Sequence, residues 1–160
     1  MKSLPALILV QILAMAPIPA IAQTAFETMV GDWRGSGNYV EGLVDVQLRC
    51  RFTITGDASA IHMAGRCASS LGGEDFTMDF ERGPDGTATV QNGQSSRADG
   101  SAIDVLTGQL GANGLVVNGA ADDETITVQL LLNDDGTLNF ATRETSRGQA
   151  TQAYVTLTRR

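Results

Sequence analysis

Apolar and polar residues alternate strictly over one long stretch of the chain, residues 44–55. Each even-numbered position is apolar and each odd-numbered position is polar. A period of two is typical of a β-strand that buries one face and exposes the other to water. Turn-forming residues follow at 56–59, and the alternation resumes over 60–67. The two stretches therefore predict a β-hairpin.

The rest of the chain repeats this pattern in shorter segments. The segments are separated by turns rich in glycine, aspartate and asparagine, such as 83–86, 111–114 and 133–136. One helical turn is predicted at 25–30 and a loop at 92–100. Further strands are predicted at 76–81, 87–91, 103–110, 115–119, 126–132, 138–142 and 150–158. With a first strand after the helical turn, the total is about nine or ten strands.

This arrangement predicts an all-β fold. Many short strands joined by tight turns form either a sandwich or a barrel, and consecutive hairpins favour the antiparallel up-and-down meander barrel. The chain has no internal repeat and no low-complexity linker. Residues 23–160 are therefore predicted to form a single domain.

The first 22 residues have the features of a signal peptide. Lys2 gives a positive start, an apolar run covers 4–15, and Ala20-Ile21-Ala22 supplies the small residues of a cleavage site. The apolar run is shorter than the ~20 residues needed to span a bilayer. We therefore predict that residues 1–22 are removed, and that the mature protein is periplasmic or secreted.

The net charge of the chain indicates which kinds of binding partner are to be expected. Lys2 is the only lysine, so residues 23–160 carry ten arginines against 18 acidic residues, a net charge of about −8. Nucleic-acid binding needs clusters of lysine and arginine, and this balance argues against it and against binding to anionic membranes. No later segment is apolar enough to insert into a membrane as a helix. The acidity is expected to keep the surface hydrated.

The two cysteines, Cys50 and Cys67, lie on the apolar faces of the predicted hairpin. If the turn is centred between Ala58 and Ser59, Cys50 lies opposite Cys67, whereas a turn centred on Asp57 places them on a diagonal. An even number of cysteines in an exported chain favours a disulfide. We predict the first register and a cross-strand disulfide, which stabilises the fold by about 3 kcal/mol.

No pattern in the sequence predicts a catalytic or metal centre. His62, the only histidine, falls on the polar face of its strand, where exposure to solvent is expected. Two cysteines and one histidine are a poor set of zinc ligands. Asp79 and Glu81 are expected on an outer face, and the acidic stretch 122–124 lacks the ligand spacing of a calcium loop. We therefore predict a protein that is not an enzyme and holds no metal or cofactor.

The stretch 26–37, FETMVGDWRGSG, resembles the opening of calycin-type barrels, which include lipocalins and lipocalin-like bacterial periplasmic proteins. In these families a short helical turn closes one end of the barrel. A G-x-W motif, here Gly31-Asp32-Trp33, then begins the first strand. The resemblance implies that Trp33 packs at the closed end against an arginine from the last strands, either Arg159 or Arg143. Any ligand site is then expected toward the other end.

An eight-stranded barrel has an interior that is either filled by side chains or holds one small ligand. Alternation predicts these inward residues: Leu48, Phe52, Ile54, Met63, Phe76, Met78, Phe80, Ile103, Val105, Val128, Leu130 and Phe140. We assign ligand contacts to Phe52, Met63, Phe76, Met78, Phe80 and Phe140. The leading hypothesis is an exported binding protein that holds a small apolar ligand or acts as a structural binding module.

Two groups of lipocalin-like barrels imply other functions. Small periplasmic inhibitors of metalloproteases have one disulfide and an exposed N-terminal segment that blocks the protease cleft. Protease inhibition, with a protease as partner, is therefore the alternative function, although the corresponding segment here, 23–29, is short. Haem-binding nitrobindin-like barrels use a proximal histidine, and the position of His62 on a polar face does not fit that role.

Overall fold

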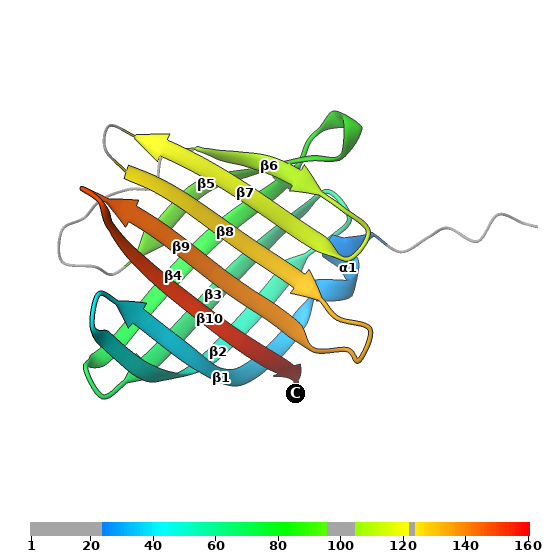
Figure 1. The fold of residues 1–160 in the computed structure, drawn as a ribbon. Helices are drawn as coiled ribbons and strands as arrows, with labels where there is room; N and C mark the ends of the chain where they lie inside the picture. Colours follow the sequence, from blue (N-terminus) through cyan, green and yellow to red (C-terminus); the bar gives the residue numbers. More distant parts are fainter. Residues whose placement is uncertain (1–23, 96–104, 122–123) are drawn as a thin grey trace, which may run out of the picture.

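The computed structural model describes residues 24–95, 105–121 and 124–160, which form a closed barrel of ten antiparallel strands with one short helix at one end (Figure 1). The predicted all-β meander barrel of lipocalin-like form is thus confirmed. The elements are α1 (Ala25–Met29), β1 (Gly31–Glu41), β2 (Val44–Gly56), β3 (Ala60–Ser69), β4 (Gly72–Arg82), a 3-10 turn (Pro84–Gly86), β5 (Thr87–Ser95), β6 (Leu106–Leu110), β7 (Gly114–Ala121), β8 (Glu124–Leu132), β9 (Leu138–Ser146) and β10 (Gln149–Arg159).

Each strand pairs with its neighbours in the sequence, and β1 pairs with β10 to close the ring. The ten strands agree with the nine or ten predicted from the sequence, and they enclose a wider interior than eight strands would, because barrel diameter grows with strand number. The β1–β10 seam depends on glycine. A Cβ at Gly35 would lie 1.8 Å from the carbonyl oxygen of Thr156, so a larger residue there would force the two strands apart.

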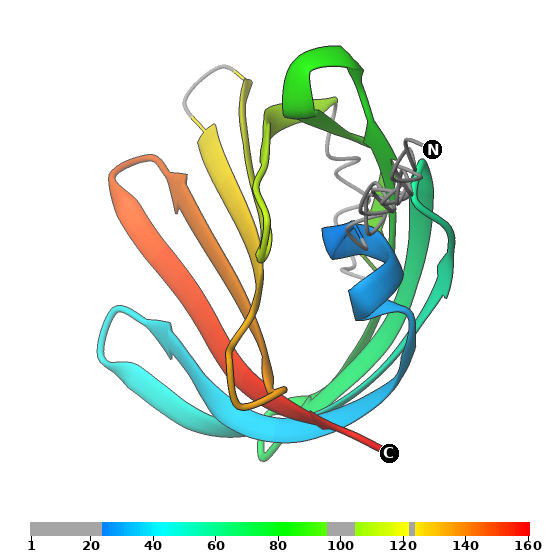
Figure 2. The ribbon, with the colours of Figure 1, turned by 90° about the vertical axis from the view of Figure 1, so that its right-hand side faces the viewer.

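Helix α1 lies at the right-hand end of the barrel in Figure 1 and within the ring of strands in Figure 2, which views that end. A capping box begins it: the Glu27 amide donates to the Thr24 hydroxyl, and the Glu27 carboxylate accepts from the Thr24 amide. The side chains of Phe26 and Met29 are fully buried in the barrel core. In the described part of the chain, no helix has the length and apolar character needed to cross a bilayer.

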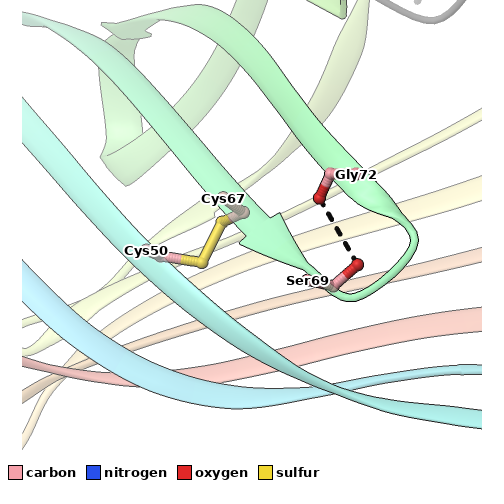
Figure 3. Close-up of a disulfide and its surroundings, with 4 residues drawn as sticks. All are labelled: Cys50, Cys67, Ser69 and Gly72. Carbon is pink, nitrogen blue, oxygen red and sulfur yellow. Dashed lines mark hydrogen bonds between the residues drawn. A yellow bond between two sulfur atoms is a disulfide. The ribbon is translucent and has the colours of Figure 1, made fainter.

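The β2–β3 hairpin has the predicted register. Cys50 lies opposite Cys67 and Ile54 opposite Met63. The disulfide joins β2 and β3, with 4.1 Å between the two Cα atoms (Figure 3). The next turn, at the end of β3, carries a hydrogen bond from the Ser69 hydroxyl to the Gly72 carbonyl (Figure 3). The predicted disulfide is confirmed.

The alternation in β6 was assigned to the wrong face. Leu106 is 2% exposed and points inward, whereas Val105, predicted to be inside, is 63% exposed. Residues 103–110 place apolar side chains at both odd and even positions, so the pattern alone does not choose between the two phases. Ile103, also predicted to be inside, lies outside the described residues, as do residues 1–22 of the predicted signal peptide.

Candidate functional site

The two ends of the barrel are built differently. We call the end that holds α1 the closed end; the turns 56–60, 110–114 and 132–138 lie there. We call the opposite end the open end; the turns 41–44, 69–72 and 146–149 surround it. A cavity of about 470 Å³ occupies the open half of the interior and is lined by residues next to these turns. Small-molecule sites typically measure about 300–1,000 Å³.

Trp33 fills the closed end. Its side chain is 1% exposed, and its indole Nε1 donates a hydrogen bond to the Met29 carbonyl at 2.8 Å. The Arg159 guanidinium lies 4.7 Å from the ring centroid, and its Nη1 donates to the Val30 carbonyl at 2.8 Å. Arg159 is therefore the arginine that contacts Trp33. The other candidate, Arg143, is exposed on β9 opposite Gln152 and does not reach the tryptophan.

Two phenylalanines, Phe76 and Phe140, separate the filled half from the cavity, and we call them the aromatic floor. Phe52 meets Phe76 and Phe140 edge to face, with ring centroids 5.2 and 5.0 Å away. The rings of Phe76 and Phe140 stack at 5.6 Å and line the cavity from below. Gly65 makes room for this packing, because a Cβ there would lie 2.4 Å from Cζ of Phe76.

Below the floor the interior is packed with apolar side chains. The buried residues that do not line the cavity include Phe26, Met29, Trp33, Phe52, Ile54, Ile61, Met63, Phe80, Leu115, Val117, Leu130, Leu138, Val155 and Leu157. The remaining cavity walls combine apolar side chains with small ones: Leu48, Met78, Leu106, Gly119, Ile126, Val128, Thr142, Thr151 and Ala153. The cavity therefore exists because small residues replace large ones at inward positions near the open end.

Four glutamates also line the cavity, and we call Glu41, Glu74, Glu124 and Glu144 the mouth carboxylates. They belong to β1, β4, β8 and β9 and lie near the open ends of these strands. Glu41 accepts a hydrogen bond from the Tyr39 hydroxyl at 2.8 Å, and Glu124 accepts one from the Ser146 hydroxyl at 2.9 Å. Among the described lining residues there is no lysine, arginine or histidine.

Large apolar residues are also exposed around this opening. Leu43, in the 41–44 turn, is 106% exposed, and Leu71, in the 69–72 turn, is 69% exposed. Val105 lies directly before β6 and is exposed as well. Leu71 and Val105 line the cavity as well. A ligand entering the barrel would thus meet apolar side chains before it reaches the interior.

Three of the six residues predicted to contact a ligand line this cavity. Phe76, Met78 and Phe140 line it. Phe52, Met63 and Phe80 point inward but are buried in the filled half, at 2% exposure or less. Alternation tells which face of a strand points inward and says nothing about depth along the barrel axis. The mouth carboxylates were missed, although each occupies an inward position of its strand.

The outer face carries one side-chain pair of chemical interest. His62 Nδ1 lies 2.6 Å from Asp79 Oδ1, and both side chains are more than 40% exposed on neighbouring strands. Neither residue lines the cavity. Among the described residues, no group of three or more His, Cys, Asp or Glu side chains is placed to hold a metal ion. The cavity at the open end is therefore the candidate site.

Comparisons with known proteins bear on the fold. No family model matched the sequence, and no curated protein matched it. Among solved structures, the barrel is similar to an S-type phycobiliprotein lyase from Guillardia theta, with a TM-score of 0.57 over 84% of this chain and 90% of that chain. The two sequences are 13% identical, so the similarity concerns the fold alone. Together with the closed antiparallel barrel, it is consistent with a lipocalin-like fold.

Proposed function

We propose that this protein is an exported binding protein, without enzymatic activity, that holds a small and largely apolar ligand in the open half of its barrel. The observation that carries the proposal is the cavity of about 470 Å³ above the aromatic floor. Export is supported by the signal-like residues 1–22 and by a disulfide, which persists in oxidising compartments.

The cavity favours binding for two physical reasons. Its floor and walls are largely apolar, and burying apolar ligand surface yields about 25 cal/mol for each Å² removed from water. It is also preformed by a closed barrel, so little conformational entropy is lost when a ligand enters. The similar solved structure is a phycobiliprotein lyase. Because the two sequences are only 13% identical, the proposal uses the similarity of the two barrels and not the activity of the lyase.

Protease inhibition receives no comparable support. That mechanism needs an exposed N-terminal segment, and the described part of this segment, α1, is docked into the closed end through Phe26 and Met29. We therefore favour ligand binding.

The test is a binding titration with an uncharged fluorescent probe, N-phenyl-1-naphthylamine. Ala153→Trp adds a large side chain inside the cavity, whereas the matched control Ala141→Trp adds the same side chain at an outward position of β9. We expect the wild type and the control to bind the probe, and Ala153→Trp to lose at least about tenfold in affinity.

Circular dichroism checks that each variant is folded. If Ala153→Trp fails to fold, Thr151→Phe, nearer the mouth, replaces it. Failure of the wild type to bind the probe, or equal binding by the wild type, Ala153→Trp and Thr151→Phe, would show that the cavity is not the binding site.

A further inference from the structure

The inward rows of four strands change from apolar to acidic residues near the open end of the barrel. In β4 the row runs Phe80, Met78, Phe76 and then Glu74; in β8 it runs Leu130, Val128, Ile126 and then Glu124. In β9 the row reaches Glu144, one inward position before the end of the strand, and in β1 it ends on Glu41. Deeper in the barrel the described cavity lining is mainly apolar, and the acidic lining residues all lie near the open end. The cavity thus has an apolar body and an anionic opening.

The strand register places the mouth carboxylates around the ring. Glu41 lies opposite Thr151, and Thr151 lies opposite Glu144 on the next strand. Glu144 lies opposite Ile126, one inward position below Glu124. Three carboxylates therefore follow one side of the mouth across β1, β10, β9 and β8. Glu74, on β4, is five strands away from Glu144 in either direction around the ten-strand ring, so the fourth carboxylate is on the opposite wall.

The hydrogen bonds of two of these carboxylates do not neutralise them. The donors to Glu41 and Glu124 are the hydroxyl groups of Tyr39 and Ser146, which carry no charge. Glu74 and Glu144 also interact with other groups, so Glu41 and Glu124 are the carboxylates taken to supply negative charge at the mouth. A ligand with a positively charged group at the mouth would gain charge-assisted hydrogen bonds or ion pairs, whereas an anionic group there would meet like charge.

We propose that the ligand is a cationic amphiphile: an apolar body with an amine or quaternary ammonium group at one end. The body lies on the aromatic floor formed by Phe76 and Phe140, and the charged group lies among the mouth carboxylates. This inference rests on the proposed function, because it names the ligand class for the same cavity. The charges of Glu41 and Glu124 also disfavour fatty acids and other anionic amphiphiles of similar size.

The experiment compares three probes with the same ten-carbon chain: decyltrimethylammonium, decanol and decanoate. Each is titrated below its micelle concentration against N-phenyl-1-naphthylamine bound to the wild-type protein at low ionic strength. We expect the cation to bind about tenfold more tightly than the alcohol and the anion to bind most weakly. Added salt should reduce the preference for the cation, because ions screen charges at a solvent-accessible mouth.

Two double variants identify the groups responsible. Glu41→Gln with Glu124→Gln removes two mouth carboxylates and should bring the affinity for the cation close to that for decanol, with decanol binding unchanged. The matched control, Asp85→Asn with Asp134→Asn, removes two charges from turns at the closed end and should keep the preference for the cation. Retention of the N-phenyl-1-naphthylamine signal shows that each variant is folded and keeps its cavity.

The outcomes separate the two proposals. If decanol or decanoate binds as tightly as decyltrimethylammonium, the assignment of a cationic ligand is wrong and the proposed binding function stands. The same holds if the double variant Glu41→Gln with Glu124→Gln still binds the cation more tightly than decanol. If no probe, charged or neutral, enters the wild-type cavity, the proposed binding function itself is wrong.

Discussion

At both ends of this barrel, every second residue of a strand points inward, but the closed end is packed with side chains and the open end holds a cavity. At the closed end, inward positions carry Trp33, Phe52 and Met63, and α1 fills the remaining space. At the open end, inward positions carry small or acidic residues such as Ala153 and Glu144, and a cavity remains. The difference teaches that side-chain size along the inward rows, rather than the fold, decides where a barrel can bind. It also suggests that stability and binding are assigned to different ends.

The strongest test of this division is to remove the tryptophan. Trp33→Ala should lower the free energy of unfolding by about 3–5 kcal/mol, because the ring is 1% exposed and its loss leaves a cavity beneath α1. Urea unfolding followed by circular dichroism measures this loss. Tyr154→Ala, at a 52% exposed position on the outer face of β10, is the control and should cost less than about 1 kcal/mol.

Binding completes this first test. While Trp33→Ala remains folded, its affinity for the uncharged probe should stay within about twofold of the wild type, since the altered site does not line the cavity and Phe52 lies between Trp33 and the aromatic floor. A large loss of affinity in the folded variant would show that the two ends are coupled.

At the aromatic floor, between the filled half and the cavity, a single substitution should change both the stability of the protein and its affinity for the probe. Gly65→Ala puts a methyl group 2.4 Å from Cζ of Phe76 and 2.8 Å from Cδ1 of Phe52. Overpacking of this kind costs about 1–3 kcal/mol of stability. It should also displace Phe76 into the cavity and weaken probe binding. Unfolding and probe titration of the same sample measure the two effects together.

A second change tests the mechanism of that effect. Phe76→Leu shortens the clashing side chain, so Gly65→Ala combined with Phe76→Leu should be more stable than the sum of the two single changes predicts. Additive losses would mean that the methyl group does not act through this ring.

The sequence was informative about register and direction. Apolar residues at every second position of 44–67, with a turn in the middle, predicted which residues of β2 and β3 lie opposite each other, down to the disulfide. This register is a local feature, because a period of two and a turn need only neighbouring residues to define them. The position of Trp33, which is buried at the end opposite the cavity, was implied by the family resemblance and not by the pattern itself.

The sequence pattern could not predict which inward residues reach the cavity or which arginine contacts Trp33, and the reason is physical. Whether Phe80 or Phe140 touches a cavity depends on how far each strand is shifted along its neighbours around ten strands. The choice between Arg159 and Arg143 likewise depends on the β1–β10 seam, which joins residues far apart in the chain. The mouth carboxylates had a readable signal, since each continues an inward row. An acidic residue in an inward row would have indicated the open end.

The two arginines offer a smaller test of the closed end. Arg159→Gln removes the contact over the Trp33 ring and the hydrogen bond to the Val30 carbonyl, and it should cost about 1 kcal/mol of stability. Arg143→Gln makes the same chemical change on β9 and should cost less than about 0.5 kcal/mol, because Arg143 is exposed and does not contact Trp33. Equal losses in urea unfolding would contradict the assignment of Arg159 to barrel closure.

The smallest expected effect concerns acid and the turns of the closed end. Hydrogen bonds from the Thr137 hydroxyl and amide hold the pKa of Asp135 below its ordinary value of 3.8, and those from the Ser59 hydroxyl, the Ser59 amide and the Ala60 amide do the same for the pKa of Asp57. A lowered pKa means that the folded state favours the ionised carboxylate. The resulting stabilisation is fully present above pH 3.8 and is lost as the pH falls through the lowered pKa.

Two neighbouring aspartates in the β8–β9 turn make this testable. At pH 6, Asp135→Asn should unfold at a slightly lower urea concentration than the wild type, and the difference should shrink as the pH falls below 3.8 and through the lowered pKa of Asp135. Asp134→Asn removes a carboxylate from the same turn while leaving the Thr137 hydrogen bonds in place, so its effect at pH 6 should be smaller. If Asp134→Asn and Asp135→Asn behave alike, general acidity rather than these hydrogen bonds governs the turn. The closed end would then owe its acid sensitivity to net charge.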